Sequence, residues 1–408
     1  MGEVGSLIAG APIPAAPDLV RMRRDRGEKL QHQLGAAGLD GLVLMGTSAV
    51  AYATGAVAPA VDSSHAVLDR TVAIVVSGAP AAHLFTAHPE GAPSELPTEF
   101  VHGPLYPELD EGVTTIKRAL DELFEPGARL GCDELTHAML RGLPDREFTS
   151  AAAVLGAAKL CKTPDELACI RAAQRINELA MWDVQAMLRP GLRQTDLTAR
   201  FLRRVFELGA TTNAIDPIWQ VMPTMRAGGP WTTHGDIAFP LATGDRLLRE
   251  GDVIWVDSGI TYQGYASDFG RTWIVGADPA PSARQQAQFD QWAAVVEAVL
   301  ERCQPGTTAL ELGQTAIAAN EGVKPWIEHF YLAHGVGTDS AEMPLIGTDL
   351  GASFDERLIL QPGMVFVLEP VIWDDGAAGY RAEDIVAITD DGWVPLSAHP
   401  YDPFVGAW

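Results

Sequence analysis

Hydrophobic and polar positions alternate between strand-like and helical spacing along the first 160 residues. Short apolar runs predict buried strands, at 41–46, 71–76 and 82–86. Charged runs with helical spacing predict helices, at 18–36 and near 111–123 and 135–141. Such alternation is typical of a small α/β domain, which we place at residues 1–160.

A second domain is expected from residue 161 to residue 408, and it opens on a clear helix start. Thr163 precedes Pro164, and Glu166 follows three residues after Thr163, which is the arrangement of a capping box. A long amphipathic helix should therefore run to about Met187. A second helix should begin from Thr195.

One short motif occurs twice in this second domain. The pattern Pro-Gly-x4-Asp/Glu-Leu begins at Pro190 and again 115 residues later at Pro305, each time between two helical runs. A match this short also arises by chance, so the motif leaves open whether the domain contains an internal duplication. A real duplication would place two helix pairs behind one sheet.

The composition narrows the class of protein. The 408 residues include 29 Lys and Arg against 53 Asp and Glu, and the net charge of −24 disfavours binding to nucleic acid or to an anionic membrane. The four cysteines form no C-x-x-C pair, which indicates a reducing compartment. We expect a cytoplasmic protein, because residues 1–17 lack a secretory signal and no apolar run reaches about 18 residues.

Acidic residues stand inside apolar, β-favouring sequence between Val253 and Thr389. The runs 253–260 and 264–276 predict a hairpin that turns at Gln263-Gly264. The candidate metal ligands are Asp257, Asp268, His334, Glu369 and Glu383. Taken singly, each would be an ordinary turn or strand-end residue. Jointly, four costly buried carboxylates match the charge of two divalent ions, and one imidazole suits Mn, Fe, Co or catalytic Zn.

The joint pattern resembles the pita-bread metallohydrolases, the family of methionine aminopeptidase, aminopeptidase P, prolidase and creatinase. The matching pieces are VDSG, SDFGRT, HGVG, LEP and RAED, in the order Asp, Asp, His, Glu, Glu. The resemblance implies an α+β protein with a pita-bread catalytic domain that contains a pseudo-two-fold repeat. It also implies a smaller creatinase-like α/β domain in front, and we expect a homodimer.

The resemblance also implies a role for each ligand. Asp257 would hold one ion, Asp268 and Glu383 would bridge both, and His334 and Glu369 would hold the second. A hydroxide between two divalent ions, with manganese expected ahead of iron, cobalt or zinc, would attack the amide C–N bond of a short peptide. Glu369 would shuttle the proton. The leading hypothesis is a metal-dependent hydrolase of the Xaa-Pro peptidase type.

The histidines that such peptidases keep near the metals depart from the family pattern. In HGVGTDSAEMP the second histidine position is Ala341, while His234 and His329 stand at shifted positions. We expect His234, His329 or Arg381 to supply the missing hydrogen-bond donor. Two alternatives remain open. One is a non-peptidase relative acting on a small zwitterion, either a lyase of the dimethylsulfoniopropionate type or a creatinase-like amidohydrolase, and the other is a binding module without catalytic activity.

Overall fold

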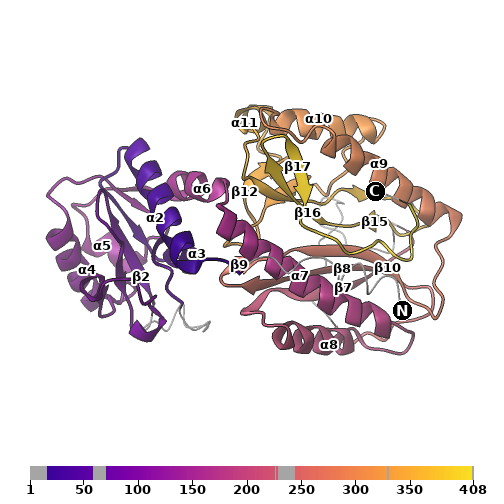
Figure 1. Cartoon of the computed structure of the whole chain (residues 1–408), viewed down its shortest axis with the longest axis horizontal. Helices are drawn as coiled ribbons and strands as arrows, with labels where there is room; N and C mark the ends of the chain where they lie inside the picture. The colour runs from indigo at the N-terminus through magenta and orange to yellow at the C-terminus, as the bar shows by residue number, and fades with distance from the viewer. Residues whose placement is uncertain (1–15, 58–69, 226, 228–243, 329, 407–408) are drawn as a thin grey trace. The chain divides into compact units, whose positions relative to one another are not determined.

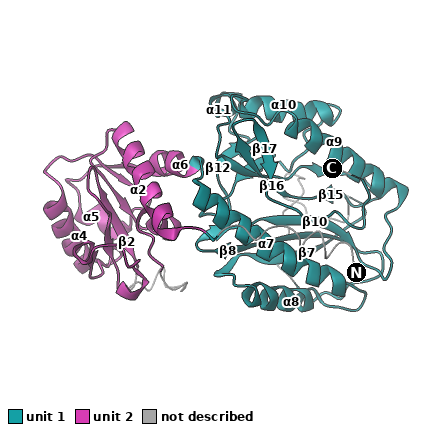
Figure 2. Ribbon diagram, viewed as in Figure 1, with its two compact units in different colours: residues 1–16, 160–408 teal, residues 17–159 magenta. Residues whose placement is uncertain are grey.

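The computed structural model describes residues 16–57, 70–225, 227, 244–328 and 330–406. The chain divides into two compact units, and each has a hydrophobic core of its own. Residues 17–159 form the smaller unit, and residues 160–408 belong to the larger one (Figure 2). The candidate ligands all belong to the larger unit.

The smaller unit is built on a six-stranded mixed sheet in the order β4-β3-β2-β1-β5-β6. Its strands are β1 (Gly41–Leu44), β2 (Val72–Val76), β3 (His83–Phe85), β4 (Val101–His102), β5 (Leu130–Cys132) and β6 (Phe148–Ser150). Its helices are α2 (Leu19–Ala36), α3 (Thr47–Thr54), α4 (Asp110–Leu123), α5 (His137–Gly142) and α6 (Ala152–Leu160), with 3₁₀ turns at Pro89–Gly91 and Thr98–Phe100. Leu42 and Val43 belong to separate apolar clusters, because neighbouring strand residues face opposite sides of the sheet.

The first half of the larger unit consists of two helices and a small antiparallel sheet. Its elements are α7 (Pro164–Met187), α8 (Gln194–Glu207), β7 (Thr212–Met222), β8 (Val253–Tyr262), β9 (Tyr265–Ala266) and β10 (Phe269–Ile274). The strand order is β10-β8-β7, and β9 also pairs with β8. The predicted hairpin is confirmed, since Gln263 and Gly264 both take positive φ in the two-residue turn between β8 and β9.

The second half adds, among the described residues, three helices, a five-stranded antiparallel sheet and a separate pair of short strands. Its elements are α9 (Ala283–Leu300), α10 (Ala309–Ala319), β11 (Ala333–Gly335), β12 (Glu342–Ile346), α11 (Ala352–Arg357), β13 (Val365–Leu368), β14 (Val371–Ile372), β15 (Tyr380–Arg381), β16 (Asp384–Thr389) and β17 (Gly392–Pro395). The sheet order is β12-β11-β13-β16-β17, and β14 pairs separately with β15. An isolated bridge between Gly270 and Glu383 joins the sheets of the two halves.

The helix starts follow the local sequence. The Thr163 hydroxyl accepts a hydrogen bond from Glu166 N, and the Glu166 carboxylate accepts one from Thr163 N. This is the predicted capping box, and α7 ends at Met187 as expected.

The helices of the larger unit lie on the outside of its strands. In Figure 1, α8 lies below the strands of the first half, and α9 and α10 lie above those of the second. The helices therefore cover the outer faces of the strands.

The two Pro-Gly motifs occupy equivalent places in the two halves. Gly191 N donates to Leu248 O at 2.8 Å, and Gly306 N donates to Leu360 O at 2.9 Å. In return, Leu248 N donates to Leu192 O, and Leu360 N donates to Thr307 O, both at 2.8 Å. The larger unit thus contains an internal repeat, which the motif alone left open. In each half, the same two backbone hydrogen bonds join the turn between the paired helices to the segment around Leu248 or Leu360.

Candidate metal centre

Three buried carboxylates meet where the two halves join. Asp257 lies in β8, Asp268 immediately precedes β10 and Glu383 immediately precedes β16. One carboxylate oxygen from each lies within 4.8 Å of the other two. Gly270 pairs with Asp257 and bridges to Glu383, and a Cβ at Gly270 would lie 2.5 Å from the Glu383 carboxyl carbon. Only glycine leaves room for Glu383 at this point.

The second half adds an imidazole and a fourth carboxylate. His334 lies in β11, and its Nδ1 contacts Gly335 O at 3.0 Å. That contact directs Nε2 toward the cluster, 3.3 Å from Asp268 and 3.5 Å from Glu369. Glu369 follows β13, and its main-chain N–H donates to Leu332 O. All five candidate ligands therefore converge on one buried place.

A buried guanidinium also reaches the cluster. Arg381 Nη2 lies 2.8 Å from Glu369 and 3.2 Å from Asp257, and it also contacts Glu383. The Arg381 main chain is held by the Thr272 hydroxyl, which accepts from Arg381 N and donates to Arg381 O. Burial opposes the charge on Arg381, but the surrounding carboxylates outweigh it and raise its pKa. Arg381 is thus a fixed cation of the site.

One guanidinium cannot balance four carboxylates. Burial raises the pKa of Asp268 well above its usual range, and the charge of Asp257 raises it further. Burial also raises the pKa of Glu383, although Arg381 opposes that change. Asp257 Oδ1, Glu369 Oε1 and Glu383 Oε2 are buried and make no hydrogen bond within the described part of the chain. Unpaired carboxylate oxygens beside an imidazole are the donor set that a divalent metal requires, so these residues fit a metal centre.

The helix α7 supports the first two ligands from behind. Asn177 Nδ2 donates to Ser258 O and to the Ser267 hydroxyl, both at 3.0 Å, and these serines adjoin Asp257 and Asp268. Gln174 also contacts this region, because its Oε1 accepts a hydrogen bond from the main-chain N–H of Asp268 at 3.2 Å. The polar row on α7 therefore fixes the backbone around both aspartates.

Two of the predicted site residues cannot be placed, because His234 and His329 lie outside the described residues. Ala341 is exposed. The next residue, Glu342, forms a buried ion pair with Lys162 at 2.5 Å. Sequence reasoning did not foresee this pair, since its two residues stand 180 positions apart.

A tyrosine near the cluster was also missed. The ring centroids of Tyr331 and His334 lie 4.9 Å apart, and the negative charges of Glu369, Asp268 and Glu383 act on the Tyr331 hydroxyl. The only sequence signal was an aromatic hydroxyl three residues before a candidate ligand. Such a signal is too common to single out a site residue.

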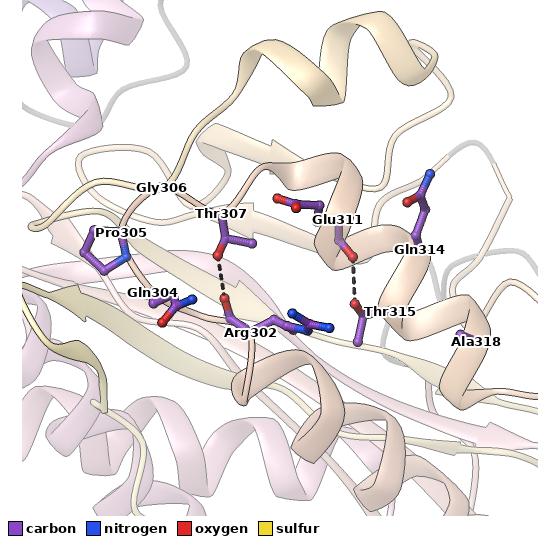
Figure 3. A pocket seen from close by; sticks show the side chains of 9 residues that line it. All are labelled: Arg302, Gln304, Pro305, Gly306, Thr307, Glu311, Gln314, Thr315 and Ala318. Carbon is purple, nitrogen blue, oxygen red and sulfur yellow. Dashed lines mark hydrogen bonds between the residues drawn. The ribbon is translucent and has the colours of Figure 1, made fainter.

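One surface hollow of the larger unit lies away from the five candidate ligands. It has a volume of about 570 Å³ and is lined by polar residues around the turn between α9 and α10, including Arg302, Gln304 and Glu311 (Figure 3). The Thr307 hydroxyl donates to Arg302 O at 2.9 Å, so this side chain satisfies its own turn. None of the five candidate ligands lines this hollow, and we assign the chemistry to the carboxylate cluster.

Comparisons with known proteins agree with this geometry. Residues 168–390 match the family model of metallopeptidase family M24, and residues 26–161 match that of the creatinase/prolidase N-terminal domain. The chain belongs to metallopeptidase family M24. The expected family and the α+β pita-bread fold are therefore confirmed, and this M24 protein is a metal-dependent peptidase.

Similar proteins carry peptidase names. The chain is 27% identical over 377 residues to the uncharacterized peptidase YqhT of Bacillus subtilis, covering 90% of this chain and 95% of that one. It is 28% identical over 285 residues to the Xaa-Pro dipeptidase of Pyrococcus furiosus, covering 67% of this chain and 76% of that one. The prolidase structure from Pyrococcus horikoshii superposes with a TM-score of 0.71 at 22% identity, covering 93% of this chain and 99% of that one.

A helix that spans a membrane must be both long and apolar. Among the described residues, no helix meets both conditions.

Proposed function

We propose that this M24 peptidase uses two divalent metal ions to hydrolyse the amide C–N bond of short Xaa-Pro peptides. The observation that carries the proposal is the cluster of three buried carboxylates within 4.8 Å, each from a different strand region, with buried oxygens that no described group satisfies. The names of the similar dipeptidases support a short peptide as substrate.

The five ligands divide between the two ions. Asp257 would hold one ion, His334 and Glu369 would hold the other, and Asp268 and Glu383 would contact both. The ions, when bound, would supply Lewis-acid activation of water and of the scissile carbonyl. We propose manganese first, because an oxygen-rich set with one imidazole suits it, with iron, cobalt and zinc as alternatives.

The protein groups around the ligands would handle the proton and the residual charge. Glu369 Oε1 makes no hydrogen bond within the described part of the chain, so this atom is available to take a proton from the attacking water and to pass it to the departing amide nitrogen. Arg381 would keep Glu369 oriented through its 2.8 Å contact with the other carboxylate oxygen. His334 would keep Nε2 toward the cluster because its Nδ1 is held by Gly335 O.

The proposal is tested by measuring metal content and peptide cleavage on the same preparation. Elemental analysis of the full-length protein should find close to two divalent ions per chain. Release of proline from a panel of Xaa-Pro dipeptides should require the metal and stop after chelation, while the reversed Pro-Xaa dipeptides serve as controls. A metal-loaded protein that releases no proline from any Xaa-Pro dipeptide would contradict the proposal.

A further inference from the structure

Tyr331 stands at the edge of the carboxylate cluster, ahead of the strand that carries His334. Its ring is tilted by 55° to the His334 ring, with the centroids 4.9 Å apart. The next residue, Leu332, accepts a hydrogen bond from the main-chain N–H of Glu369. Tyr331 is therefore fixed beside two candidate ligands by ring packing and by the adjoining backbone.

The Tyr331 hydroxyl faces negative charge and remains available. Tyr331 is only partly buried, and none of the hydrogen bonds between described residues involves its hydroxyl. In contrast, the hydroxyl of the fully buried Tyr265 donates to Glu166 at 2.9 Å. A phenol hydroxyl carries its proton at neutral pH, so this group can donate a hydrogen bond.

The site needs such a donor. Hydrolysis of an amide places negative charge on the former carbonyl oxygen, and a fixed hydrogen-bond donor stabilises it. Ala341 has no polar side-chain atom, and the nitrogens Nη1 and Nη2 of Arg381 already contact carboxylates. A protonated phenol next to His334 and Glu369 supplies the missing group without adding charge.

We propose that the Tyr331 hydroxyl donates a hydrogen bond to the scissile carbonyl oxygen of the substrate and holds it as negative charge develops there. The inference rests on the proposed function, because it assigns one more residue to the same peptide-cleaving site. It makes Tyr331 a catalytic residue that contacts the reacting atoms. No bond to Tyr331 forms or breaks, and its proton stays on the phenol oxygen.

Three variants of the full-length, metal-loaded protein test the inference. Tyr331→Phe removes the hydroxyl but keeps the ring on His334, and Tyr331→Leu removes both. Tyr262→Phe is the matched control, because Tyr262 is also a partly buried tyrosine of the same unit with no hydrogen bond from its hydroxyl to a described residue. Steady-state cleavage of an Xaa-Pro dipeptide and metal content are measured for all three.

A donor role predicts that Tyr331→Phe lowers kcat by about 10²–10³-fold. The KM should change far less, the metal content should equal that of the wild type, and Tyr262→Phe should match the wild type in every measurement. If Tyr331 only packs against His334, Tyr331→Phe would retain full kcat and only Tyr331→Leu would lose activity or metal. That result would overturn the inference.

The design separates this inference from the proposed function. A wild-type protein that cleaves the dipeptide while Tyr331→Phe keeps its kcat leaves the proposed function standing and removes the inference alone. A loss of kcat in Tyr331→Phe that follows a loss of metal would also overturn the inference. A metal-loaded wild type without cleavage would overturn both, and it is recognised before any variant is made.

Discussion

The two halves of the larger unit place their carboxylates by the same backbone plan. Asp257 is the fifth residue from the start of β8, and Glu369 takes the same place relative to the start of β13, just past its end. Asp268 immediately precedes β10, and Glu383 immediately precedes β16. The repeat therefore accounts for why four carboxylates meet where the halves join.

The helices behind the two halves use different chemistry for the same task. Helix α7 faces the first half with the buried polar residues Gln174, Asn177 and Glu178, whereas α9 packs Phe289 and Trp292 into the core of the second half. The first half thus holds its ligands mainly through amide side chains, and the second through aromatic packing together with one indole hydrogen bond, from Trp292 Nε1 to Pro370 O.

The largest effect is expected from Asp268 and Glu383, the candidate ligands at equivalent positions in the two halves. Replacing either with alanine removes a carboxylate that we assign to both ions. Metal content measured by elemental analysis should fall and peptide cleavage should drop by roughly 10³-fold or more. Asp355→Asn, at a buried aspartate outside the cluster, is the control and should keep both metal and activity. Full turnover in one of the two alanine variants would break the equivalence of the halves.

The second-largest effect is expected from two buried arginines, each of which contacts a carboxylate in the other half of the larger unit. Arg381 reaches Asp257 and Glu369, while Arg271 pairs with Asp384 at 2.9 Å and donates to main-chain carbonyls. Either change to methionine should destabilise the metal-free protein by about 3–5 kcal/mol, because a buried carboxylate loses its partner.

Added metal separates the two arginines. In denaturant unfolding, Mn²⁺ should restore much of the stability lost in Arg381→Met, since the ions would neutralise the same carboxylates. It should restore little more in Arg271→Met than in the wild type, because Asp384 is not one of the five ligands. Equal restoration in both variants would contradict the assignment of Arg381 as the cation inside the cluster.

The sequence predicted the parts of this arrangement that depend on local signals. Helix α7 was bounded correctly because Thr163 and Glu166 form a capping box, and Asp257 and Asp268 stood out because carboxylates are costly inside apolar strands. Strands β5 and β6 were not predicted, because their segments, LGC and FTS, contain no distinct apolar run.

The remainder depends on tertiary contacts that no local pattern reveals. Gly270 is needed because Glu383 approaches it from a distant strand, and Lys162 pairs with Glu342 across 180 positions. Tyr331 can be recognised as a site residue only from its distance to His334 and from the carboxylates around it. The repeat itself became visible through equivalent backbone hydrogen bonds, since an eight-residue motif with four fixed positions is too short to prove it.

A further pH-dependent contribution to stability is expected from Glu178 in α7. Burial raises the pKa of Glu178 from its ordinary 4.5 to about 7, although the main-chain N–H of Ala398 opposes this. The folded state then binds a proton that the unfolded state has lost between these values. Glu178 therefore stabilises the fold below about pH 4.5, and that contribution is lost as pH rises through 7, by at most about 3 kcal/mol.

The measurement compares wild type and Glu178→Gln by urea unfolding at pH 5 and pH 8. The wild type should lose more stability over this interval, because glutamine has no proton to release. The second half offers the control, since the apolar residues of α9 cannot titrate and Val296→Ala should leave the pH dependence as in the wild type. An identical pH dependence in wild type and Glu178→Gln would show that Glu178 does not titrate in this range.

The smallest effect is expected from two equivalent hydrogen bonds, one donated by a side chain of α7 and one by a side chain of α9. Asn177 Nδ2 donates to Ser258 O, and Trp292 Nε1 donates to Pro370 O, both at 3.0 Å. Each carbonyl belongs to the residue that follows a candidate ligand. Because a buried carbonyl without a donor costs about 1–3 kcal/mol, Asn177→Leu and Trp292→Phe should each lower the free energy of unfolding within that range. If the hydrogen bonds also fix the ligands, both variants should bind metal more weakly in calorimetric titration, by about 10-fold or more.

Trp255→Phe is a suitable control for these two variants, since Trp255 Nε1 also donates to a buried carbonyl, that of Gly379, which does not adjoin a ligand. It should lose similar stability while keeping metal affinity. Weaker metal binding in only one of the two helix variants would show that the polar and apolar halves hold their ligands by unequal means.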